Sequence, residues 1–214
     1  MASRLPRLRE RYAFALAADI ACLARREGFG RTLRKVRRGL ARSTDDVLVL
    51  EKRLDEIASI AFDRRLRLEE LDRGSLPALA EFNRGHCDTR ATRRFAGNLE
   101  RGYRGFVAYR DGAVAGYYWW VDGRIDPRHP HLLELGLALG DDDVYGFDFF
   151  LAQEHRGGGH AVEFLDGIET RLRDLGYRTL WGYVRSDNRP ARWLYSMRGY
   201  EASRTVRVMP GGIR

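Results

Sequence analysis

A glycine-rich turn in the last third of the chain has the residue types of an anion-binding site. The glycines at residues 157–159 follow an apolar stretch ending at residues 149–152 and precede a sequence with helical periodicity. The first backbone N–H groups of such a helix lack partners and meet the positive end of the helix dipole, which favours an anion. Glycine lets the backbone approach a phosphate closely, and Arg156 adds a charged donor. The segment predicts a phosphate-binding turn between a strand and a helix.

Two common phosphate-binding motifs do not describe this turn. The chain contains no G-x-x-x-x-G-K-[ST] sequence. The dinucleotide pattern G-x-G-x-x-G fails because Val162 stands where its third glycine is required. The match is to [RQ]-x-x-G-x-[GA], which Arg156, Gly159 and Ala161 fill.

A second segment, residues 188–200, carries its own pattern further along the chain. Its characteristic residues are Asn188, Ala191, Leu194, Tyr195, Gly199 and Tyr200. In this order and spacing, the two segments together resemble the GNAT superfamily of acyl-CoA-dependent N-acyltransferases. The resemblance covers about residues 63–208 and leaves out the first 62.

The resemblance implies an α/β (α+β) fold, in which helices flank a central mixed, mostly antiparallel sheet splayed between its fourth and fifth strands. It implies acetyl-CoA or a longer acyl-CoA as cosubstrate and no metal. In the family this turn binds the pyrophosphate of coenzyme A, which points to Arg156, Gly157, Gly158, Gly159, His160 and Ala161. Backbone groups of Leu151 and Ala152 are expected to bind the acyl donor. Asn188 is expected to orient the pantetheine or the loop of Tyr195.

The resemblance makes Tyr195 the general acid, because it falls at the family's tyrosine, close to the cofactor sulfur. A thiol of pKa ~8.5 leaves with little help, so the contribution expected of Tyr195 is about 10²-fold. The general base is not fixed by the resemblance. Asp148 and Glu134 are candidates on segments expected to be strands, Tyr145 comes next, and a water chain is an alternative. Because an unpaired carboxylate is costly to bury, Asp148 is expected to be functional or paired.

Aromatic residues and histidines near these segments allow further readings. The run Tyr117, Tyr118, Trp119 and Trp120 predicts either a strand buried on both faces or the lining of an acceptor or acyl groove. His129 and His131 lie beside prolines with no other ligand nearby, so no metal site is expected there.

Alternating strands and helices are expected to position these residues. Strands are predicted at residues 65–68, 105–109, 113–121, 132–139, 144–151, 177–184 and 200–208, and helices at 75–82, 89–101, 159–175 and 190–197. Residues 1–42 and 47–62 show apolar residues at helical intervals, so both are predicted to be helical. The expected domains are a basic helical N-terminal extension at 1–62 and an acyltransferase domain at 63–214.

The positive charge of the chain is concentrated at its start. The 214 residues carry a formal net charge of +8, and residues 1–42 hold 12 Lys and Arg against 3 Asp and Glu. A basic surface is therefore a local feature of this segment, which suits an acidic carrier protein or another anionic partner. Nucleic acid is not favoured, because the segment lacks the interleaved aromatic residues of a single-strand binder.

The two cysteines, Cys22 and Cys87, are far apart in sequence and have no metal-ligand spacing. They predict thiols in a reducing compartment instead of a disulfide framework, and the longest apolar stretch is too short to span a bilayer. A cytoplasmic location is therefore expected.

Three functions are compatible with the sequence. The first is transfer of an acyl group from acyl-CoA to a primary amine of a small molecule or peptide. The second is transfer of a longer chain, from acyl-CoA or an acyl carrier protein, to a peptide or amino-sugar amine. The third is a non-catalytic binding module. The sequence leaves open whether the chain forms a homodimer.

Overall fold

The computed structural model describes residues 17–33, 45–57 and 65–208, and these form two compact units. One unit combines residues 17–33 with α3 (Leu76–Gly85) and α4 (Thr89–Glu100). The other contains the sheet with α5, α6 and α7. Among the described residues, no helix combines the length and the hydropathy that a membrane span requires.

The helical unit is fastened by a disulfide and by a buried carboxylate. Residues 17–27 and 29–33 are helical, and Cys22 is bonded to Cys87, which lies between α3 and α4. Asp19, 3% exposed, accepts hydrogen bonds from the backbone N–H and the hydroxyl of Thr89 and from the Arg90 guanidinium. The prediction of separate thiols is therefore wrong, because the fold brings together residues that are distant in sequence. The reason for expecting a reducing compartment is lost, and a cytoplasmic location stays a prediction.

A seven-stranded sheet forms the second unit, in the order β2-β3-β4-β5-β6-β1-β7. Its strands are β1 (Asp45–Arg53), β2 (Arg67–Glu70), β3 (Arg104–Arg110), β4 (Ala113–Asp122), β5 (Asp143–Leu151), β6 (Thr179–Arg185) and β7 (Glu201–Val208). Every neighbouring pair is antiparallel except β5 and β6, which are parallel. This mostly antiparallel mixed sheet confirms the predicted fold class.

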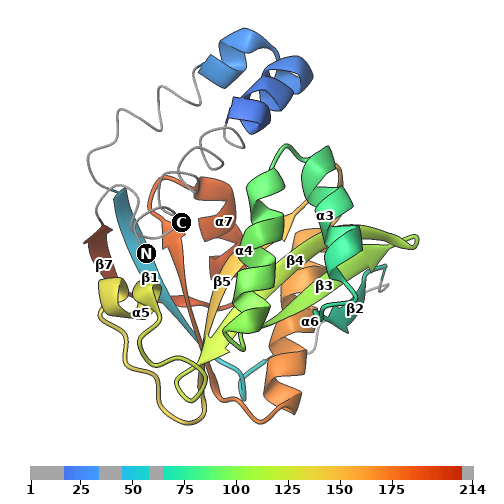
Figure 1. Cartoon of the computed structure of the whole chain (residues 1–214). Helices are drawn as coiled ribbons and strands as arrows, with labels where there is room; N and C mark the ends of the chain where they lie inside the picture. Colours follow the sequence, from blue (N-terminus) through green and yellow to red (C-terminus); the bar gives the residue numbers. More distant parts are fainter. Residues whose placement is uncertain (1–16, 34–44, 58–64, 209–214) are drawn as a thin grey trace, which may run out of the picture. The chain divides into compact units, whose positions relative to one another are not determined.

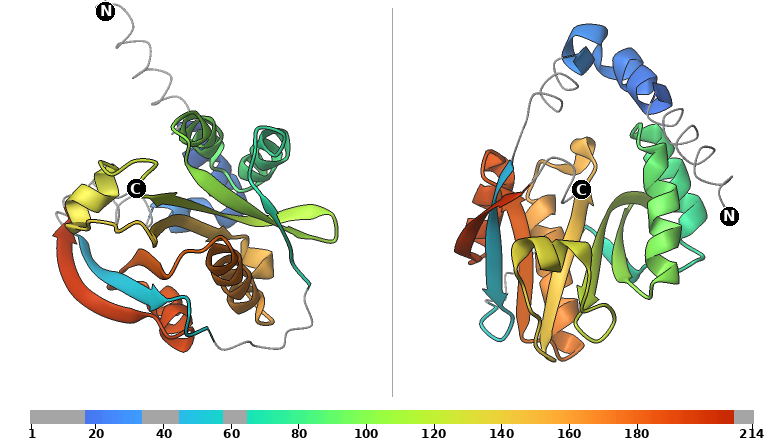
Figure 2. Two further views of the ribbon diagram at one scale, coloured as in Figure 1. Left: turned by 90° about the horizontal axis from the view of Figure 1, so that it is seen from below. Right: turned by 60° about the vertical axis from the view of Figure 1, so that its left-hand side comes forward.

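Helices α6 (His160–Asp174) and α7 (Arg189–Met197) lie on one face of this sheet (Figures 1 and 2). Apolar side chains of α6 recur at helical intervals and pack on the strands, as in the contacts of Phe164 and Ile168 with the cluster around Trp120 and Val144. The core beneath α6 fixes the start of this helix relative to the end of β5.

Strand β1 corrects the sequence prediction for residues 47–62. Residues 47–53 are a strand between β6 and β7, where Val47 and Val49 are almost fully buried. A short continuous apolar run fits a strand buried on both faces as well as it fits a helix, and β-branched residues favour the strand. The first 62 residues are therefore not wholly a helical extension. The boundary predicted near residue 63 lies outside the described residues.

The strand predicted at residues 132–139 is also wrong, because the short helix α5 (Pro130–Leu135) occupies its start. His129 caps this helix by accepting the N–H of His131, Pro130 takes the first position, and Gly136 ends it with φ +62°. Proline at the first position and a left-handed glycine after the last turn are helix boundary signals. Glu134 consequently lies on a helix, where it is exposed.

Strands β5 and β6 separate soon after they meet. Their parallel pairing covers only Asp143–Tyr145 and Thr179–Trp181. Beyond these residues β5 keeps its pairing with β4, and β6 keeps its pairing with β1. A wedge opens between the two strands, as the resemblance implied for strands four and five.

Candidate active site

The wedge between β5 and β6 holds a cavity of about 250 Å³. Its lining comes from β4, β5, β6 and α7, namely Tyr118, Gly146, Phe147, Asp148, Phe149, Tyr183, Val184, Arg185, Asn188, Ala191 and Tyr195. The fold thus brings together three residues singled out from the sequence, Asp148, Asn188 and Tyr195. We call this space the wedge cavity.

Tyr118 reaches the wedge cavity across a glycine. A Cβ atom on Gly146 would overlap the Tyr118 hydroxyl, so the absence of a side chain on β5 makes room for this ring. Burial raises the pKa of Tyr118 well above its usual value, and the neighbouring Tyr195 and Glu169 add to the shift. The phenol is therefore a neutral donor at physiological pH. The prediction of a buried strand is confirmed for Tyr118, and the lining of an acceptor or acyl groove stays a prediction.

A bulge in β5 positions Asp148. Its φ is +56°, and the register between β4 and β5 shifts opposite it, between Tyr117 and Trp119. Asp is among the few residues that adopt this left-handed conformation at modest cost. The bulge breaks the alternation of side chains, so that Phe149 packs against Phe164 of α6. Asp148 is half-buried and lines the wedge cavity.

Tyr195 occupies the α7 side of the wedge cavity. The ring is half-buried and packs edge-on against Tyr200, with 4.9 Å between centroids. Burial, and then the charge of Glu169, raise the pKa of Tyr195 far above its usual value. Tyr195 is therefore a neutral hydrogen-bond donor at physiological pH.

Asn188 has a structural task at the edge of the wedge cavity. Its side-chain oxygen accepts the N–H of Ala191 at 3.3 Å and so caps α7. The cap fixes the start of the helix that carries Tyr195, while the amide NH₂ of Asn188 keeps its two donors. The role predicted for Asn188 towards the loop of Tyr195 has a physical basis in this bond.

The predicted turn lies between β5 and α6. Gly158 and Gly159 have φ values of +63° and +83°, and Gly159 is the N-cap of α6. Such angles strain a residue with a side chain. A Cβ on Gly157 or Gly159 would meet no atom within 4 Å, so the space over the turn is open. The predicted strand, glycine turn and helix are confirmed, and phosphate binding stays a prediction.

Three groups expected to bind the cofactor have partners inside the protein. The Arg156 guanidinium donates to the Leu151 carbonyl at 2.8 Å and lies over the Phe150 ring. The N–H of Ala152 donates to the carbonyl of Ala115 at 2.9 Å. Ala152 therefore offers no free backbone donor, and Arg156 braces the end of β5. These two hydrogen bonds could not be predicted from the sequence, because they depend on how the turn packs against the sheet.

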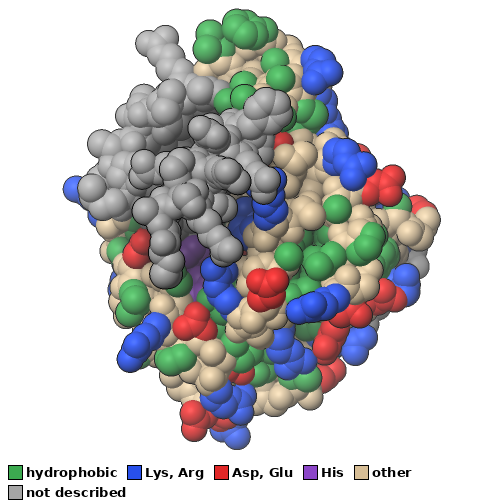
Figure 3. Space-filling view, viewed as in Figure 1, with side chains coloured by type: hydrophobic (Ala, Val, Ile, Leu, Met, Phe, Trp, Pro, Cys, Tyr) green, Lys and Arg blue, Asp and Glu red, His purple; other side chains and the backbone are tan. Residues whose placement is uncertain are grey.

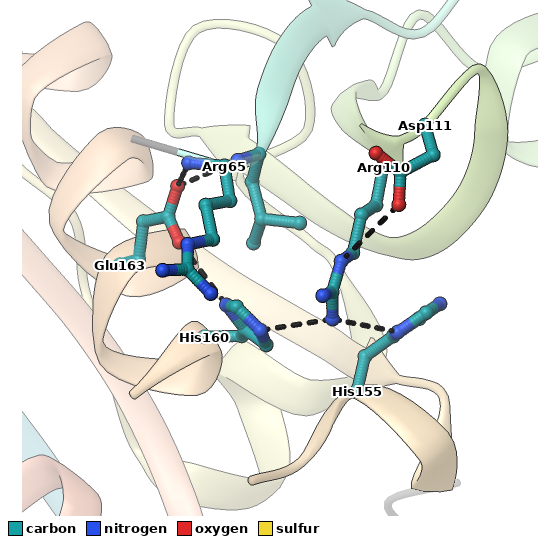
Figure 4. A network of polar contacts seen from close by, with 7 residues as sticks. Arg65, Arg110, Asp111, His155, His160 and Glu163 are labelled. Atoms are coloured by element: carbon teal, nitrogen blue, oxygen red, sulfur yellow. Dashed lines mark hydrogen bonds and ion pairs between the residues drawn. The ribbon is translucent and has the colours of Figure 1, made fainter. Parts of the chain in front are cut away.

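A network beside the turn was missed by the sequence analysis (Figure 4). Arg110, at the end of β3, donates to Nε2 of His160 at 2.9 Å and lies 3.5 Å from Nδ1 of His155. Because Nε2 of His160 accepts, its Nδ1 carries the proton and faces Glu163 at 3.3 Å. Glu163 also accepts the backbone N–H groups of Arg65 and Leu66. The network ties the start of β2 and the β3–β4 hairpin to the first turn of α6.

The remaining candidates lie outside the wedge cavity. Glu134 does not line it, and His129 and His131 cap and pack α5, with Nδ1 of His131 3.1 Å from the Tyr145 hydroxyl. Burial, as the largest effect, lowers the pKa of His129. No group of three or more potential metal ligands is found in the part of the chain that the structure describes.

The sequence model of the acetyltransferase (GNAT) family matches residues 65–200, which include the wedge cavity and the glycine turn. The chain belongs to the GNAT acetyltransferase family. Members of this family use acetyl-CoA or acyl-CoA. A curated relative is the uncharacterized N-acetyltransferase YycN of Bacillus subtilis, 28% identical over 87 residues. That alignment covers 41% of this chain and about half, 49%, of the relative.

Solved structures share the GNAT fold. A GNAT-family acetyltransferase from Colwellia psychrerythraea has a TM-score of 0.55 at 15% identity, over 78% of this chain and 57% of its own. A conserved protein of unknown function from Staphylococcus epidermidis has a TM-score of 0.57 at 11% identity, over 82% and 64% of the two chains. The glucosamine N-acetyltransferase region of a fungal β-N-acetylglucosaminidase scores 0.54 at 16% identity, over 83% of this chain and 22% of that one. At these identities the likeness concerns the fold alone.

Proposed function

We propose that this GNAT protein transfers an acyl group from acyl-CoA to a primary amine. The observation that carries the proposal is the wedge cavity, where Asp148 and Tyr195 line one space at the splay of β5 and β6. The glycine turn before α6 supports it, because the open, left-handed backbone at Gly159 suits the approach of a pyrophosphate. Acetyl-CoA or a longer acyl-CoA is the proposed cosubstrate.

The proposed reaction is a direct attack. The neutral amine nitrogen forms a bond to the thioester carbon, and a tetrahedral intermediate carries the charge on oxygen. The carbon–sulfur bond then breaks, and the thiolate of coenzyme A leaves. One proton of the amine passes to a base, and the sulfur takes up one proton from the surroundings. The protein has to remove the first proton and stabilise both developing negative charges.

Tyr195 is the proposed partner of the sulfur. Since burial raises the pKa of Tyr195 far above that of a thiol, about 8.5, complete transfer of the phenol proton to the thiolate is unfavourable. A hydrogen bond from the neutral hydroxyl stabilises the thiolate without that cost. Tyr118, which also lines the wedge cavity and is also neutral, supplies a second phenol to the same space.

Asp148 is the proposed base, acting on the amine directly or through a water. It lines the wedge cavity, and a bulge holds it there. Glu134 stays a weaker candidate, because it is exposed on α5 and does not line that cavity. The intact glycine turn and Tyr195 favour catalysis over the alternative of a binding module.

Two variants test the proposal with acetyl-CoA and a panel of primary amines. Tyr195→Phe removes the hydroxyl and keeps the ring, so kcat should fall by up to about 10²-fold while KM for acetyl-CoA changes little. Gly159→Val places a β-branched side chain at φ +83° beside the turn, and the affinity for coenzyme A in calorimetry should fall at least tenfold. A folded Gly159→Val protein that binds coenzyme A like the wild type contradicts the cofactor assignment. Unchanged turnover in Tyr195→Phe contradicts the role at sulfur.

We also propose that the basic segment at residues 1–42 binds an anionic partner such as an acyl carrier protein, which would deliver a longer chain. Only residues 17–33 of this segment are described, and Asp19 and Cys22 fasten them to α3 and α4. On the face shown in Figure 3, by contrast, basic and acidic side chains are interspersed. Reversing the charge of the exposed Arg25 and Arg31 is a cleaner test than deletion, because the helical unit keeps its core. Carrier-protein use should then weaken, and acetyl-CoA turnover should not.

A further inference from the structure

A second and larger cavity, of about 560 Å³, lies under α7 next to the wedge cavity. Its floor consists of four apolar side chains on three neighbouring strands. Leu48 of β1 faces Val184 of β6, and Leu50 of β1 faces Ala202 of β7. Ligand pockets usually measure 300–1,000 Å³ and are mainly apolar, so both size and lining suit a small molecule. We call this space the α7 pocket.

One face of α7 forms the side of the α7 pocket. The contributing residues are Arg189, Arg192, Trp193 and Ser196, at spacings of three and four that place them on a single helix face. Trp193 is 65% exposed, although tryptophan is among the costliest side chains to leave in water. An apolar ligand under this helix would cover it.

The charge of the α7 pocket has one sign. Its described lining contains two arginines and no carboxylate. Arg192 is held in place by donating to the Ser186 carbonyl at 3.0 Å, and no ion pair of Arg189 is found among the described residues. A guanidinium presents five N–H donors in a fork that matches a carboxylate. The pocket therefore fits an apolar body that carries a carboxylate.

Tyr195 and Val184 line both cavities, so a ligand in the α7 pocket is adjacent to the wedge cavity. Arg192 and Tyr195 are three residues apart on α7 and are neighbours on its surface, with Cβ atoms ~5–6 Å apart. If Arg192 binds the carboxylate of a ligand, a second group on the carbon that carries this carboxylate lies close to Tyr195.

We propose that the α7 pocket binds the acyl acceptor, and that this acceptor is an α-amino acid with an apolar side chain. The carboxylate binds Arg189 and Arg192, and the side chain lies on the floor of the pocket. The amine points past Tyr195 towards the wedge cavity. The inference rests on the proposed acyl transfer, and it names the acceptor class for that reaction.

The test compares L-leucine with L-leucinamide, which lacks the carboxylate, in binding and in turnover. The proteins are the wild type, the double variant Arg189→Gln/Arg192→Gln, and Arg178→Gln as a control at an exposed arginine outside both cavities. Calorimetry measures amino-acid binding without any reaction, and release of coenzyme A from acetyl-CoA measures turnover. Because the two amines differ in pKa, the leucine-to-leucinamide ratio of kcat/KM is compared between proteins.

The double variant should lower that ratio roughly tenfold or more, as expected for lost hydrogen bonds to a charged group, and Arg178→Gln should leave it unchanged. An unchanged ratio in the double variant, or no binding of any apolar amino acid to the wild type, overturns the inference. Binding of leucine that requires both arginines, without release of coenzyme A, supports the pocket and counts against the proposed acyl transfer. Ala202→Trp tests whether the α7 pocket holds the acyl chain of the donor instead of the acceptor. If this variant loses activity with decanoyl-CoA but keeps activity with acetyl-CoA and leucine, the pocket holds the acyl chain and the inference is wrong.

Discussion

The Cys22–Cys87 disulfide gives a quantitative prediction about stability. Replacing both cysteines with serine removes the disulfide that joins residues 17–33 to the α3–α4 segment within the described helical unit. The single variant Cys22→Ser also removes the bond but keeps Cys87, so it separates the loss of the bond from the effect of the second substitution. Both variants retain the hydrogen bonds of Asp19 to Thr89, so the two segments still have a non-covalent contact.

The size of the effect follows from the length of chain that the bond closes. The two cysteines are separated by 65 residues. The loss of loop-closure entropy in the unfolded chain then amounts to about 4 kcal/mol at 25 °C, in the chain-entropy model of disulfide stabilisation. Engineered and natural bonds often deliver less than this figure, so we expect a loss of about 2–4 kcal/mol in the free energy of unfolding.

Urea unfolding followed by two signals measures this loss. The protein has four tryptophans, Trp119, Trp120, Trp181 and Trp193, and all lie in the sheet unit. Tryptophan fluorescence therefore follows the sheet unit, and far-ultraviolet circular dichroism also detects the helices of the other unit. In both variants the transition seen by circular dichroism should move to lower urea.

Two results would refute this reasoning. The first is a wild-type protein, purified without reductant, in which both cysteines react with a thiol reagent in denaturant. The second is a wild type with the bond intact whose circular-dichroism transition coincides with that of both variants. The first result would also restore the argument for a reducing compartment.

Two further predictions concern the sheet unit. Gly146→Ala should lower the free energy of unfolding by about 1–3 kcal/mol, because the new Cβ overlaps the Tyr118 hydroxyl; adding Tyr118→Phe should recover part of the loss in thermal unfolding. Asp122 is buried, which alone would raise its pKa, yet hydrogen bonds from the Tyr177 hydroxyl and backbone N–H groups hold the pKa of Asp122 below its usual value. Its contribution to stability is therefore present above pH ~4 and lost as pH falls further. In Asp122→Asn the free energy of unfolding, measured by urea titrations at several pH values, should decrease less steeply as the pH falls.

The chemistry-bearing segments of the site could be predicted because they are local. The glycine turn and Tyr195 belong to short patterns, and each lies on the expected element. Asp148 was identified because a carboxylate in an apolar strand requires an explanation. Its bulge could not be predicted, because it depends on the register between β4 and β5.

What the sequence did not supply depends on tertiary contacts. The sequence predicts a helix for residues of β1, since a short apolar run has no period that distinguishes a helix from a strand. Arg110 gave no signal, because its partners His155 and His160 come from a segment that follows it at a distance along the chain. Leu151 and Ala152 are predicted to bind the acyl donor, but the sequence does not show that the Leu151 carbonyl and the Ala152 N–H have partners inside the protein.

The position of β1 in the sheet has a consequence for how the protein folds. During synthesis this strand is made well before both of its neighbours, β6 and β7, as the pairs Leu48–Val184 and Leu48–Thr205 show. Contacts between residues so far apart in sequence give the sheet a high contact order. Folding is slow because the long loop must close before these contacts can form. Until β6 and β7 arrive, both edges of an apolar strand remain open to other chains. The nascent protein therefore has a long interval in which intermolecular strand pairing competes with completion of the sheet.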